Sequence, residues 1–245
     1  MSVLQSVSRV IRAVEFLAER ESARLDEVAA EIDVHKSNAL RLLATLRAHN
    51  WVAVDDTRTL YSIGPRLASI GRAAVAGLEL HKALSLAEDL RDLTGETVHV
   101  SMPHGDKMLV VGRADSPNAL KVTCDVGTED LLHSTAVGKA YLASLSDAAL
   151  EELLESLDLA PITPATLSTP EALREDVASI RERHYATNLQ EARRGTSALA
   201  VALRFGPFTP VLCLSITGPA ERFTRAVMGR MAPDILELVA PHQAL

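Results

Sequence analysis

A chain of 245 residues in which 47% are hydrophobic and 23% are charged can bury one large core or two modest ones, and this composition excludes an intrinsically disordered protein. No apolar run approaches the roughly 20 residues of a membrane span. No basic-then-apolar signal peptide opens the sequence either, so we expect a cytoplasmic protein without a membrane partner. Cys124 and Cys213 have no CxxC spacing, which indicates two reduced, buried thiols.

The distribution of charge decides whether a formal net charge of −7 permits DNA binding. Residues 81–245 carry 15 basic and 22 acidic side chains, whereas residues 35–72 carry six lysines and arginines against two aspartates. Contacts to DNA phosphates need only such a local positive patch. The sequence therefore allows a DNA-binding surface within an acidic protein.

The first predicted element is a helix over residues 6–20, with Ser6 as its N-cap. Five apolar residues recur at helical spacing along it, and we expect this stripe to pack on the elements that follow. The five are Val7, Val10, Ile11, Val14 and Leu17.

Residues 25–50 are predicted to form two short helices, at about 25–32 and 35–48, joined by a tight turn. Asp33 in that turn can adopt an unusual backbone conformation and cap the second helix. The second helix has two contrasting faces. Its apolar face is Ala39, Leu42, Leu43 and Leu46, and its opposite face is Ser37, Asn38, Arg41 and Thr45.

A helix with such a polar face fits the major groove of DNA, where base edges present hydrogen-bond donors and acceptors. The two helices therefore indicate a helix-turn-helix, with an ordinary αα-hairpin inside a core as the alternative. A short hairpin formed by residues 51–54 and 60–63 follows as a wing. At its tip, Arg58 would reach a phosphate or the minor groove, or would be a solvated turn residue. The predicted DNA contacts are Lys36, Ser37, Asn38, Arg41, Thr45 and Arg58.

Gly64-Pro65 ends the wing and starts a further helix, which we interpret as a linker and part of a dimer interface. The remaining chain alternates predicted strands and helices, which indicates antiparallel hairpins covered by helices and hence an α+β domain. The predicted strands are residues 96–102, 107–113, 119–126, 197–204 and 211–217, the last two joined through Gly206-Pro207. The predicted helices are residues 80–93, 134–144, 147–156, one that carries Leu173, Val177 and Ile180, and one that starts near Ala220.

Six stretches in this order resemble the IclR family of bacterial transcriptional regulators, and together they extend over nearly the whole chain. They are SVSRVIRAVEFL, HKSNALRLLATL, YSIGPRLASIG, GETVHVSM, LLHSTAVGKAYLAS and LSITGPAERFT. The resemblance implies a winged helix-turn-helix DNA-binding domain at residues 1–64, a linker helix at 65–79 and a GAF/profilin-like effector-binding domain at 80–245. It also implies a homodimer or dimer of dimers. The partners would be operator DNA and a small-molecule effector that releases a repressor from a catabolic operon.

The sequence departs from the family pattern at positions that bear on both sites. The family usually has glycine at Asp33, and threonine or valine at Asn38 and Ala39, so the base-reading set differs. In the effector domain, an acidic residue often stands at the position of Asn188 and a cysteine at that of Ala198. The family's way of holding a small carboxylate is therefore not carried over directly.

A pocket for an organic acid or amide is predicted where residues 133–140 enter a helix. Ser134 or Thr135 would cap this helix, and the free N–H groups of its first turn would attract an anion. Ser215 and Thr217 project from one face of a strand, with satisfied hydroxyls in a sheet as the alternative. The predicted effector contacts, partly by family resemblance, are Val122, Ala136, Val137, Asn188, Ala198, Ser215 and Thr217.

The sequence lacks the common catalytic motifs that would indicate an enzyme. The GKA sequence at residues 138–140 lacks the upstream glycine and the serine or threonine of a phosphate-binding loop. No GxSxG elbow is present. His99, His104 and His133 do not have metal-ligand spacing with either cysteine. We therefore expect no catalytic residue, cofactor or metal. The two alternatives are an enzyme that uses the C-terminal domain and an architectural DNA-binding protein whose second domain is ligand-free.

Overall fold

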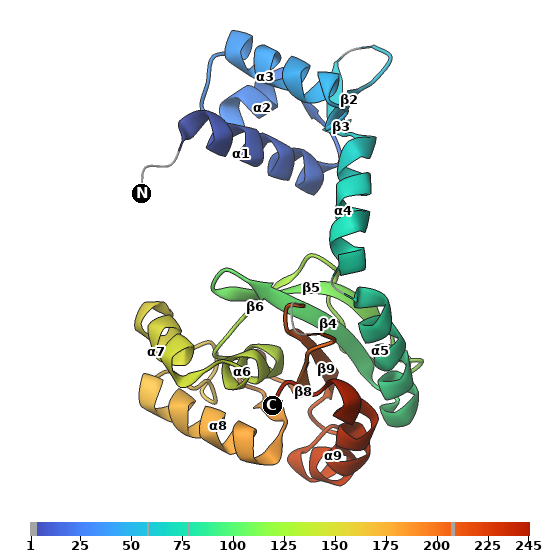
Figure 1. The fold of residues 1–245 in the computed structure, drawn as a ribbon, viewed down its shortest axis with the longest axis vertical. Helices are drawn as coiled ribbons and strands as arrows, with labels where there is room; N and C mark the ends of the chain where they lie inside the picture. The colour runs from blue at the N-terminus through green and yellow to red at the C-terminus, as the bar shows by residue number, and fades with distance from the viewer. Residues whose placement is uncertain (1–3, 58, 78, 207–208) are drawn as a thin grey trace. The chain divides into compact units, whose positions relative to one another are not determined.

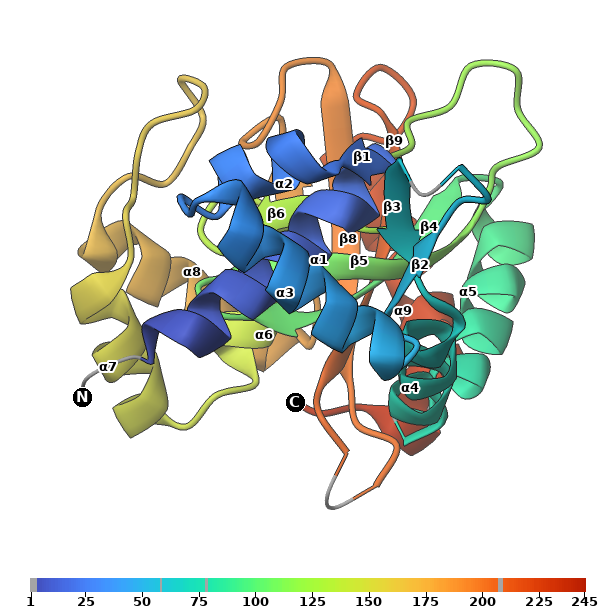
Figure 2. The ribbon, with the colours of Figure 1, turned by 90° about the horizontal axis from the view of Figure 1, so that it is seen from above.

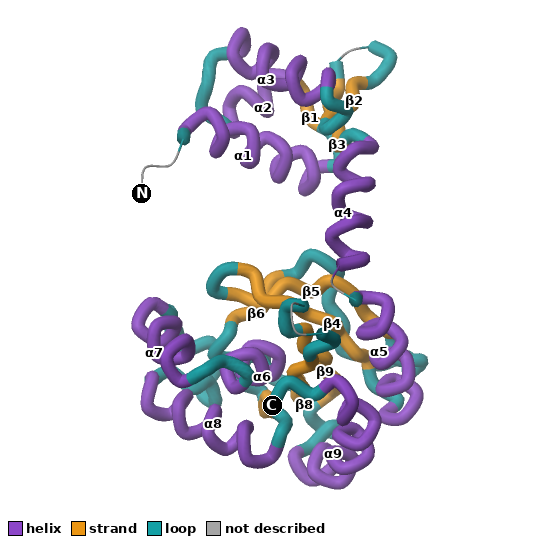
Figure 3. The backbone as a smooth tube through the Cα atoms, viewed as in Figure 1, coloured by secondary structure: helices purple, strands orange, loops and turns teal. Residues whose placement is uncertain are grey.

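The computed structural model describes residues 4–57, 59–77, 79–206 and 209–245. The chain divides into two compact units, Met1–Gly77 and Leu78–Leu245, and each is described by itself. Helices and strands occur in both units, as the colours of Figure 3 show, so the protein is α+β as predicted.

The first unit is a winged helix-turn-helix (Figure 1). Its small antiparallel sheet has the strand order β1-β3-β2. Asp33 lies in the turn between the second and third helices with φ of 52°, as predicted, but it does not cap the third helix, whose N-cap is His35. The elements are α1 (Gln5–Arg20), β1 (Ala23–Arg24), α2 (Leu25–Glu31), α3 (Lys36–Ala48), β2 (Val52–Val54), β3 (Leu60–Ile63) and α4 (Pro65–Gly77).

The apolar stripe of α1 is only partly in the core, which corrects the sequence prediction. Leu17 is fully buried, but Val7 and Ile11 are 50% and 51% exposed. The core-facing side of α1 is instead formed by Ala13 and Leu17, with Val10 and Val14 packed partly against the same core, and it leaves Val7 and Ile11 exposed. Ser6 is not the N-cap; Leu4 holds that position without a side-chain hydrogen bond.

The second unit is a six-stranded antiparallel sheet with helices on both faces (Figures 1 and 2). The strand order is β6-β5-β4-β9-β8-β7. Its strands are β4 (Thr97–His104), β5 (Lys107–Ala114), β6 (Glu129–Leu131), β7 (Ala186–Leu189), β8 (Thr196–Leu203) and β9 (Leu212–Pro219). Its helices are α5 (Leu80–Thr94), α6 (Ala136–Ala143), α7 (Asp147–Ser156), α8 (Pro170–Arg183), α9 (Arg225–Val239) and the short η1 (Ala240–His242).

Alternation along the strands gives this sheet two apolar cores. On β8, Leu199 and Val201 face the core shared with α5 and α9, whereas Ala198 and Ala200 face the core shared with α6, α7 and α8. The face under α6 carries small residues, so this helix approaches the sheet closely. The functional pocket described below lies on this second face.

Four elements of the second unit differ from the sequence prediction. Residues 119–126 form an irregular segment, because Leu120 and Val126 are 68% and 58% exposed and their alternation does not face a core. Strands β6 and β7 were not predicted, and the final helix starts at Arg225 after its N-cap Thr224 rather than near Ala220. Pro207, in the predicted connection, lies outside the described residues.

Gly138 allows α6 to dock against the segment that precedes it. A Cβ atom at this position would lie 2.3 Å from the carbonyl oxygen and 2.4 Å from the Cα of Leu132, and both are backbone atoms. We expect Gly138→Ala to lower the free energy of unfolding by about 3 kcal/mol, at the upper end of overpacking costs, because neither backbone can move away cheaply. Urea denaturation measures this.

Gly229→Ala is the matched control, because Gly229 also lies inside a helix of this unit and a Cβ atom there would meet no neighbouring group of the described chain within 4 Å. That substitution should raise stability by up to about 1 kcal/mol through helix propensity. Equal stability of the Gly138→Ala variant and the wild type would contradict the close approach at Leu132.

Candidate functional site

The outer face of α3 is a hydrogen-bonding surface. Ala39, Leu43 and Leu46 are buried and hold the helix on the core of the first unit. The four polar residues predicted for the opposite face are exposed, and three of them line one groove. The exposed set is Ser37, Asn38, Arg41 and Thr45, and the groove includes Asn38, Arg41 and Thr45.

Within this surface Arg41 is available for an external partner. Among the residues that the structure describes, its guanidinium enters no ion pair. Thr45 donates its hydroxyl hydrogen to the carbonyl of Arg41 over 2.9 Å, which leaves its oxygen free to accept. Arg9 of α1 lines the same groove and was missed, because the spacing of one helix does not show what a neighbouring helix adds.

Two of the six predicted DNA contacts, Lys36 and Arg58, are not among the four polar residues of α3 that form this hydrogen-bonding surface. The Nζ of Lys36 lies 3.7 Å from Oδ2 of Asp26 at an exposed position, and Lys36 does not line the groove. Arg58 lies outside the described residues. Both remain predictions.

Asp55 organises the turn of the wing. Its Oδ1 accepts hydrogen bonds from the backbone N–H groups of Thr59 and Leu60 over 2.7 and 2.9 Å, and Thr57 donates its hydroxyl to Oδ2. These bonds, the one from Leu60 first, lower the pKa of Asp55 to about 2.

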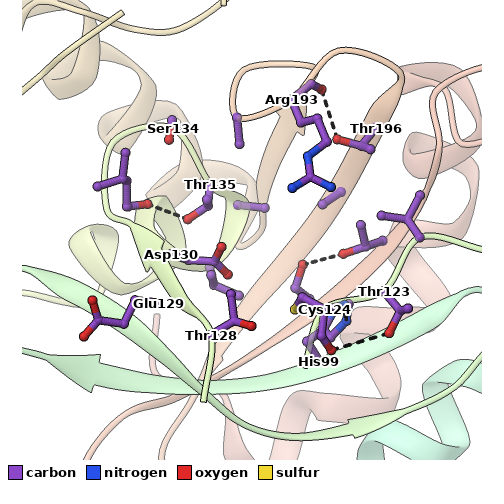
Figure 4. Close-up of a pocket in the computed structure, with 18 of the residues that line it drawn as sticks. His99, Thr123, Cys124, Thr128, Glu129, Asp130, Ser134, Thr135, Arg193 and Thr196 are labelled. Atoms are coloured by element: carbon purple, nitrogen blue, oxygen red, sulfur yellow. Dashed lines mark hydrogen bonds between the residues drawn. The ribbon is translucent and has the colours of Figure 1, made fainter. Parts of the chain in front are cut away.

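A cavity of about 300 Å³ opens in the second unit between the sheet and the start of α6 (Figure 4). Its floor comes from neighbouring strands, because His99 pairs with Ser215 and Thr217 pairs with Ala198, which puts their side chains on one face. Six of the seven predicted effector contacts line it. They are Val122, Ala136, Val137, Ala198, Ser215 and Thr217.

The N-terminus of α6 forms one wall of this cavity. Thr135 is its N-cap: the hydroxyl accepts from the N–H of Gly138 over 3.2 Å and donates to the carbonyl of Leu131 over 2.6 Å. The N–H groups of Ala136 and Val137 meet no acceptor in the described parts of the chain. Free N–H groups at a helix start attract anions, so this wall suits a carboxylate.

Ser215 and Thr217 add two hydroxyls beside that wall. Their oxygens lie 3.2 Å apart, so one hydroxyl donates to the other and the pair retains a hydrogen to offer a ligand. Ser215 is nearly buried, which reduces competition from water. Together with the helix N–H groups, the hydroxyls provide the donors that a small carboxylate requires.

The wall that carries Val122 belongs to the irregular segment between β5 and β6, and both main-chain polar groups of Cys124 hold it in place. The N–H of Cys124 donates to Nε2 of His99 over 3.2 Å, and the Cys124 carbonyl accepts from Nη1 of Arg113 over 2.9 Å. Burial, reinforced by the Arg113 guanidinium, lowers the pKa of His99 to about 4. His99 is therefore neutral at pH 7, and because Nε2 accepts, its proton is on Nδ1.

Neither cysteine is a reactive thiolate in this structure. Burial raises the pKa of Cys124 to about 11 and also raises the pKa of Cys213. Both thiols are free, as predicted, although Cys124 is only partly buried. No group of three or more potential metal ligands occurs among the described residues.

Asn188 does not line the cavity, which corrects the prediction that it faces this region. Its Oδ1 accepts from the backbone N–H of Glu191 over 2.8 Å, so the carboxamide closes the turn after β7. Three charged lining residues were missed, Glu129 and Asp130 on β6 and Arg193 in the β7–β8 turn. No motif marks any of them, because each enters the cavity only through sheet register and loop conformation.

Two family models match the chain. The IclR helix-turn-helix domain matches residues 6–56, and the bacterial transcriptional regulator IclR C-terminal model matches residues 73–240. The chain is 28% identical over 236 residues to the HTH-type transcriptional regulator BhcR of Paracoccus denitrificans, which covers 96% of this chain and 84% of that protein. It is 27% identical over 225 residues to the transcriptional repressor IclR of Escherichia coli, with 90% and 82% covered.

Solved structures agree with this assignment. The IclR of Thermotoga maritima superposes with a TM-score of 0.74 at 25% identity and covers 96% of each chain. An IclR homologue from Microbacterium hydrocarbonoxydans, complexed with 4-hydroxybenzoate, has the same fold, with a TM-score of 0.80 at 19% identity over 96% and 97% of the two chains. No described helix is long and apolar enough to cross a membrane. Since the C-terminal model alone matches more than half of the chain, this protein is a member of the IclR family of bacterial transcriptional regulators, with a helix-turn-helix domain for DNA and a second domain for an effector.

Proposed function

We propose that this protein is a repressor that acts in the cytoplasm as a homodimer or dimer of dimers and releases its operator when a small organic acid binds. Relatives named as repressors, IclR and AllR of Escherichia coli, support the sign of regulation. We assign the chain no catalytic role, because the relatives named here are transcriptional regulators.

In a dimer, two copies of α3 would enter successive major grooves, at half-sites about 34 Å or a multiple of it apart. Residues 65–79 would act as the linker between a DNA-binding domain at 1–64 and an effector domain at 80–245. Effector binding would bias two arrangements of the DNA-binding domains, provided that the effector binds one arrangement more tightly.

The observation that carries the effector class is the convergence of donors on one cavity. The cavity is lined by the N–H groups of Ala136 and Val137, which have no partner among the described residues, and by the hydroxyls of Ser215 and Thr217. A buried carboxylate needs several such donors. The apolar residues Val122 and Ala198 would contact the remainder of the ligand, as is usual for small-molecule pockets. The homologue complexed with 4-hydroxybenzoate is consistent with an acid in this fold.

We expect Ser215→Ala to weaken effector affinity about 10- to 100-fold, because one hydrogen bond to a charged group is worth about 1.5–3 kcal/mol. Operator affinity without effector should stay unchanged. Gel shifts titrated with the acid that gives the largest thermal shift in a screen of organic acids measure both quantities.

Ser101→Ala is the matched control. Ser101 is buried on β4 two residues from His99, its hydroxyl has no partner among the described groups, and it does not line the cavity. It should leave the effector response unchanged. A normal response in the Ser215→Ala variant would reject the proposed carboxylate site.

A further inference from the structure

Two charged side chains of the pocket are left without a partner of opposite sign. Asp130 and Arg193 both line the cavity, and neither takes part in an ion pair among the residues that the structure describes. In Figure 4 they enter from different walls, Asp130 from β6 and Arg193 from the turn between β7 and β8. Arg193 is exposed to solvent and Asp130 is half-buried, so a ligand that carries both an acid group and a hydrogen-bond donor would complement the two side chains.

The position of Asp130 follows from strand geometry. Asp130 pairs with Met108 of β5, and successive residues of β6 point to opposite sides. Glu129 also lines the cavity, but its carboxylate pairs with Lys107 over 2.6 Å, whereas Asp130 on the other side of the strand is turned into the cavity (Figure 4). The carboxylate oxygens of Asp130 accept no hydrogen bond from the described groups, so they are available to a ligand.

Arg193 is held near the pocket by its own turn. The backbone N–H of Gln190 donates to the carbonyl of Thr196 over 3.1 Å, and the side chain of Gln190 accepts from the N–H of Gly195 over 2.9 Å. The side chain of Glu191 is fixed inside the unit on Lys139 over 2.6 Å. The turn therefore has a defined conformation, from which the guanidinium of Arg193 projects into the cavity (Figure 4).

A simple monocarboxylate fits this charge pattern poorly. Its acid group would satisfy Arg193, the α6 N–H groups and the hydroxyls of Ser215 and Thr217, but Asp130 would then face it as a second, unpaired anion. Burial raises the pKa of Asp130, which reflects the cost of its charge in this environment, and Arg193 offsets only part of the shift. A ligand with a second group that donates a hydrogen bond removes this cost.

We propose that the effector is a small organic acid that also carries a hydrogen-bond donor, such as a hydroxyl or ammonium group, and that Asp130 accepts from this donor while Arg193 and the start of α6 hold the acid group. This inference rests on the proposed acid-binding function and adds the chemical class of its ligand. Asp130 is then the residue that distinguishes a substituted acid from a plain one.

The test uses acids that differ only in the donor group. Propionate, lactate and alanine form one set, and benzoate, 4-hydroxybenzoate and 4-aminobenzoate form another. Binding to the full-length protein is measured by calorimetry at pH 7. We expect at least one donor-bearing acid to bind 10- to 100-fold more tightly than the plain acid of its set. Asp130→Ala should abolish this preference and strengthen binding of the plain acid, whereas the control Asp106→Ala, in the exposed turn between β4 and β5, should preserve it.

A ligand-free measurement checks the state of Asp130 itself. A raised carboxyl pKa means that the folded protein loses stability as the pH rises from the ordinary aspartate value through the folded-state pKa. Asp130→Asn removes that loss, so its melting temperature should exceed that of the wild type at pH 7, with no gain at pH 3.5. A lower melting temperature at pH 7 would show that Asp130 is stabilised by partners within the protein.

The outcomes separate the two proposals. If acids bind and Ser215→Ala weakens them, but plain and donor-bearing acids bind equally, the inference about Asp130 is overturned and the acid pocket stands. The inference is likewise overturned if Asp130→Ala retains the wild-type preference. If no acid of either set binds, the proposed acid-binding function itself fails.

Discussion

Replacing Arg41 with alanine weakens specific operator binding by about 30-fold or more while the protein stays folded. Arg41 is exposed on α3 between Asn38 and Thr45, and it enters no ion pair in the described chain. An arginine that binds a base edge contributes about 1–3 kcal/mol of discrimination. A dimer loses this contact at both half-sites, so we expect a loss of about 2–6 kcal/mol, or about 30-fold to more than 10,000-fold in affinity. Gel shifts on the fragment that the wild type selects from genomic DNA measure the loss.

Arg47→Ala is the matched control for this prediction. Arg47 is exposed on the same helix, but six residues from Arg41 place it about 120° around the helix axis. Its loss should reduce binding slightly and equally for all DNA sequences, as a phosphate contact does. Both variants should melt within a few degrees of the wild type, since surface substitutions change stability little. Unchanged operator affinity in the Arg41→Ala variant would reject the proposed recognition face.

Replacing Lys139 with methionine destabilises the second unit by about 3–5 kcal/mol, the cost of breaking a buried ion pair by removing one partner. The side chain of Lys139 is 2% exposed, and its Nζ lies 2.6 Å from Oε2 of Glu191 and 2.8 Å from Oδ2 of Asp176. Methionine keeps the volume but leaves two carboxylates without this cation. Arg183, 3.3 Å from Asp176, compensates only that one. Urea denaturation measures the change.

The effect should depend on pH. Burial already raises the pKa of Glu191, and attraction to Lys139 offsets part of that shift. Without Lys139 this pKa rises further, so the variant loses stability as the pH rises and regains it as Glu191 takes up a proton. The loss should therefore be larger at pH 8 than at pH 5.

Lys107→Met provides the comparison. The Nζ of Lys107 lies 2.6 Å from Glu129, the same distance as in the buried pair, but both side chains are exposed. Exposed pairs contribute little, so this variant should retain nearly the wild-type stability. The double variant Lys139→Met/Glu191→Gln should recover part of the loss. If the two methionine substitutions lowered the free energy of unfolding equally, burial would not be the reason that the Lys139 ion pair stabilises the protein.

The sequence predicts the helix-turn-helix well, because its helices are short, strongly amphipathic and local. The recognition helix was expected over residues 35–48 and spans Lys36–Ala48. The apolar stripe of α1 shows the limit of such reasoning. Periodicity indicates that Val7 and Ile11 share an apolar face, but it does not show whether another element covers that face.

Residues 119–126 were predicted as a strand for a related reason. Their alternation is typical of a strand, but their backbone is held by side chains from elsewhere, including Arg222, which donates to the carbonyl of Leu120 over 2.8 Å. Such long-range bonds leave no local pattern. Strands β6 and β7 are three and four residues long, too short for a periodicity to be visible.

The pocket residues also divide into those that a local sequence pattern indicates and those that only the folded chain brings together. The spacing of Ser215 and Thr217 predicts that they share one face of a strand, family resemblance assigned them to the pocket, and Thr135 was one of two candidate caps for the helix start. The positions of Asp130 and Arg193 in the pocket could not be predicted, because the sequence does not show which residues the fold brings next to an isolated charged side chain. Asn188 was placed by family resemblance, and its side chain is instead occupied by the turn after β7.

The fastening of the pocket wall at Cys124 bears on how such a regulator diversifies. Both bonds to His99 and Arg113 use main-chain atoms of Cys124, so neither depends on the side chain at Val122. Val122, whose side chain lines the cavity, can therefore be exchanged during evolution while these two bonds are kept. A gene duplicate could acquire a new inducer through one or two codon changes in this segment, while its promoter recognition is inherited intact.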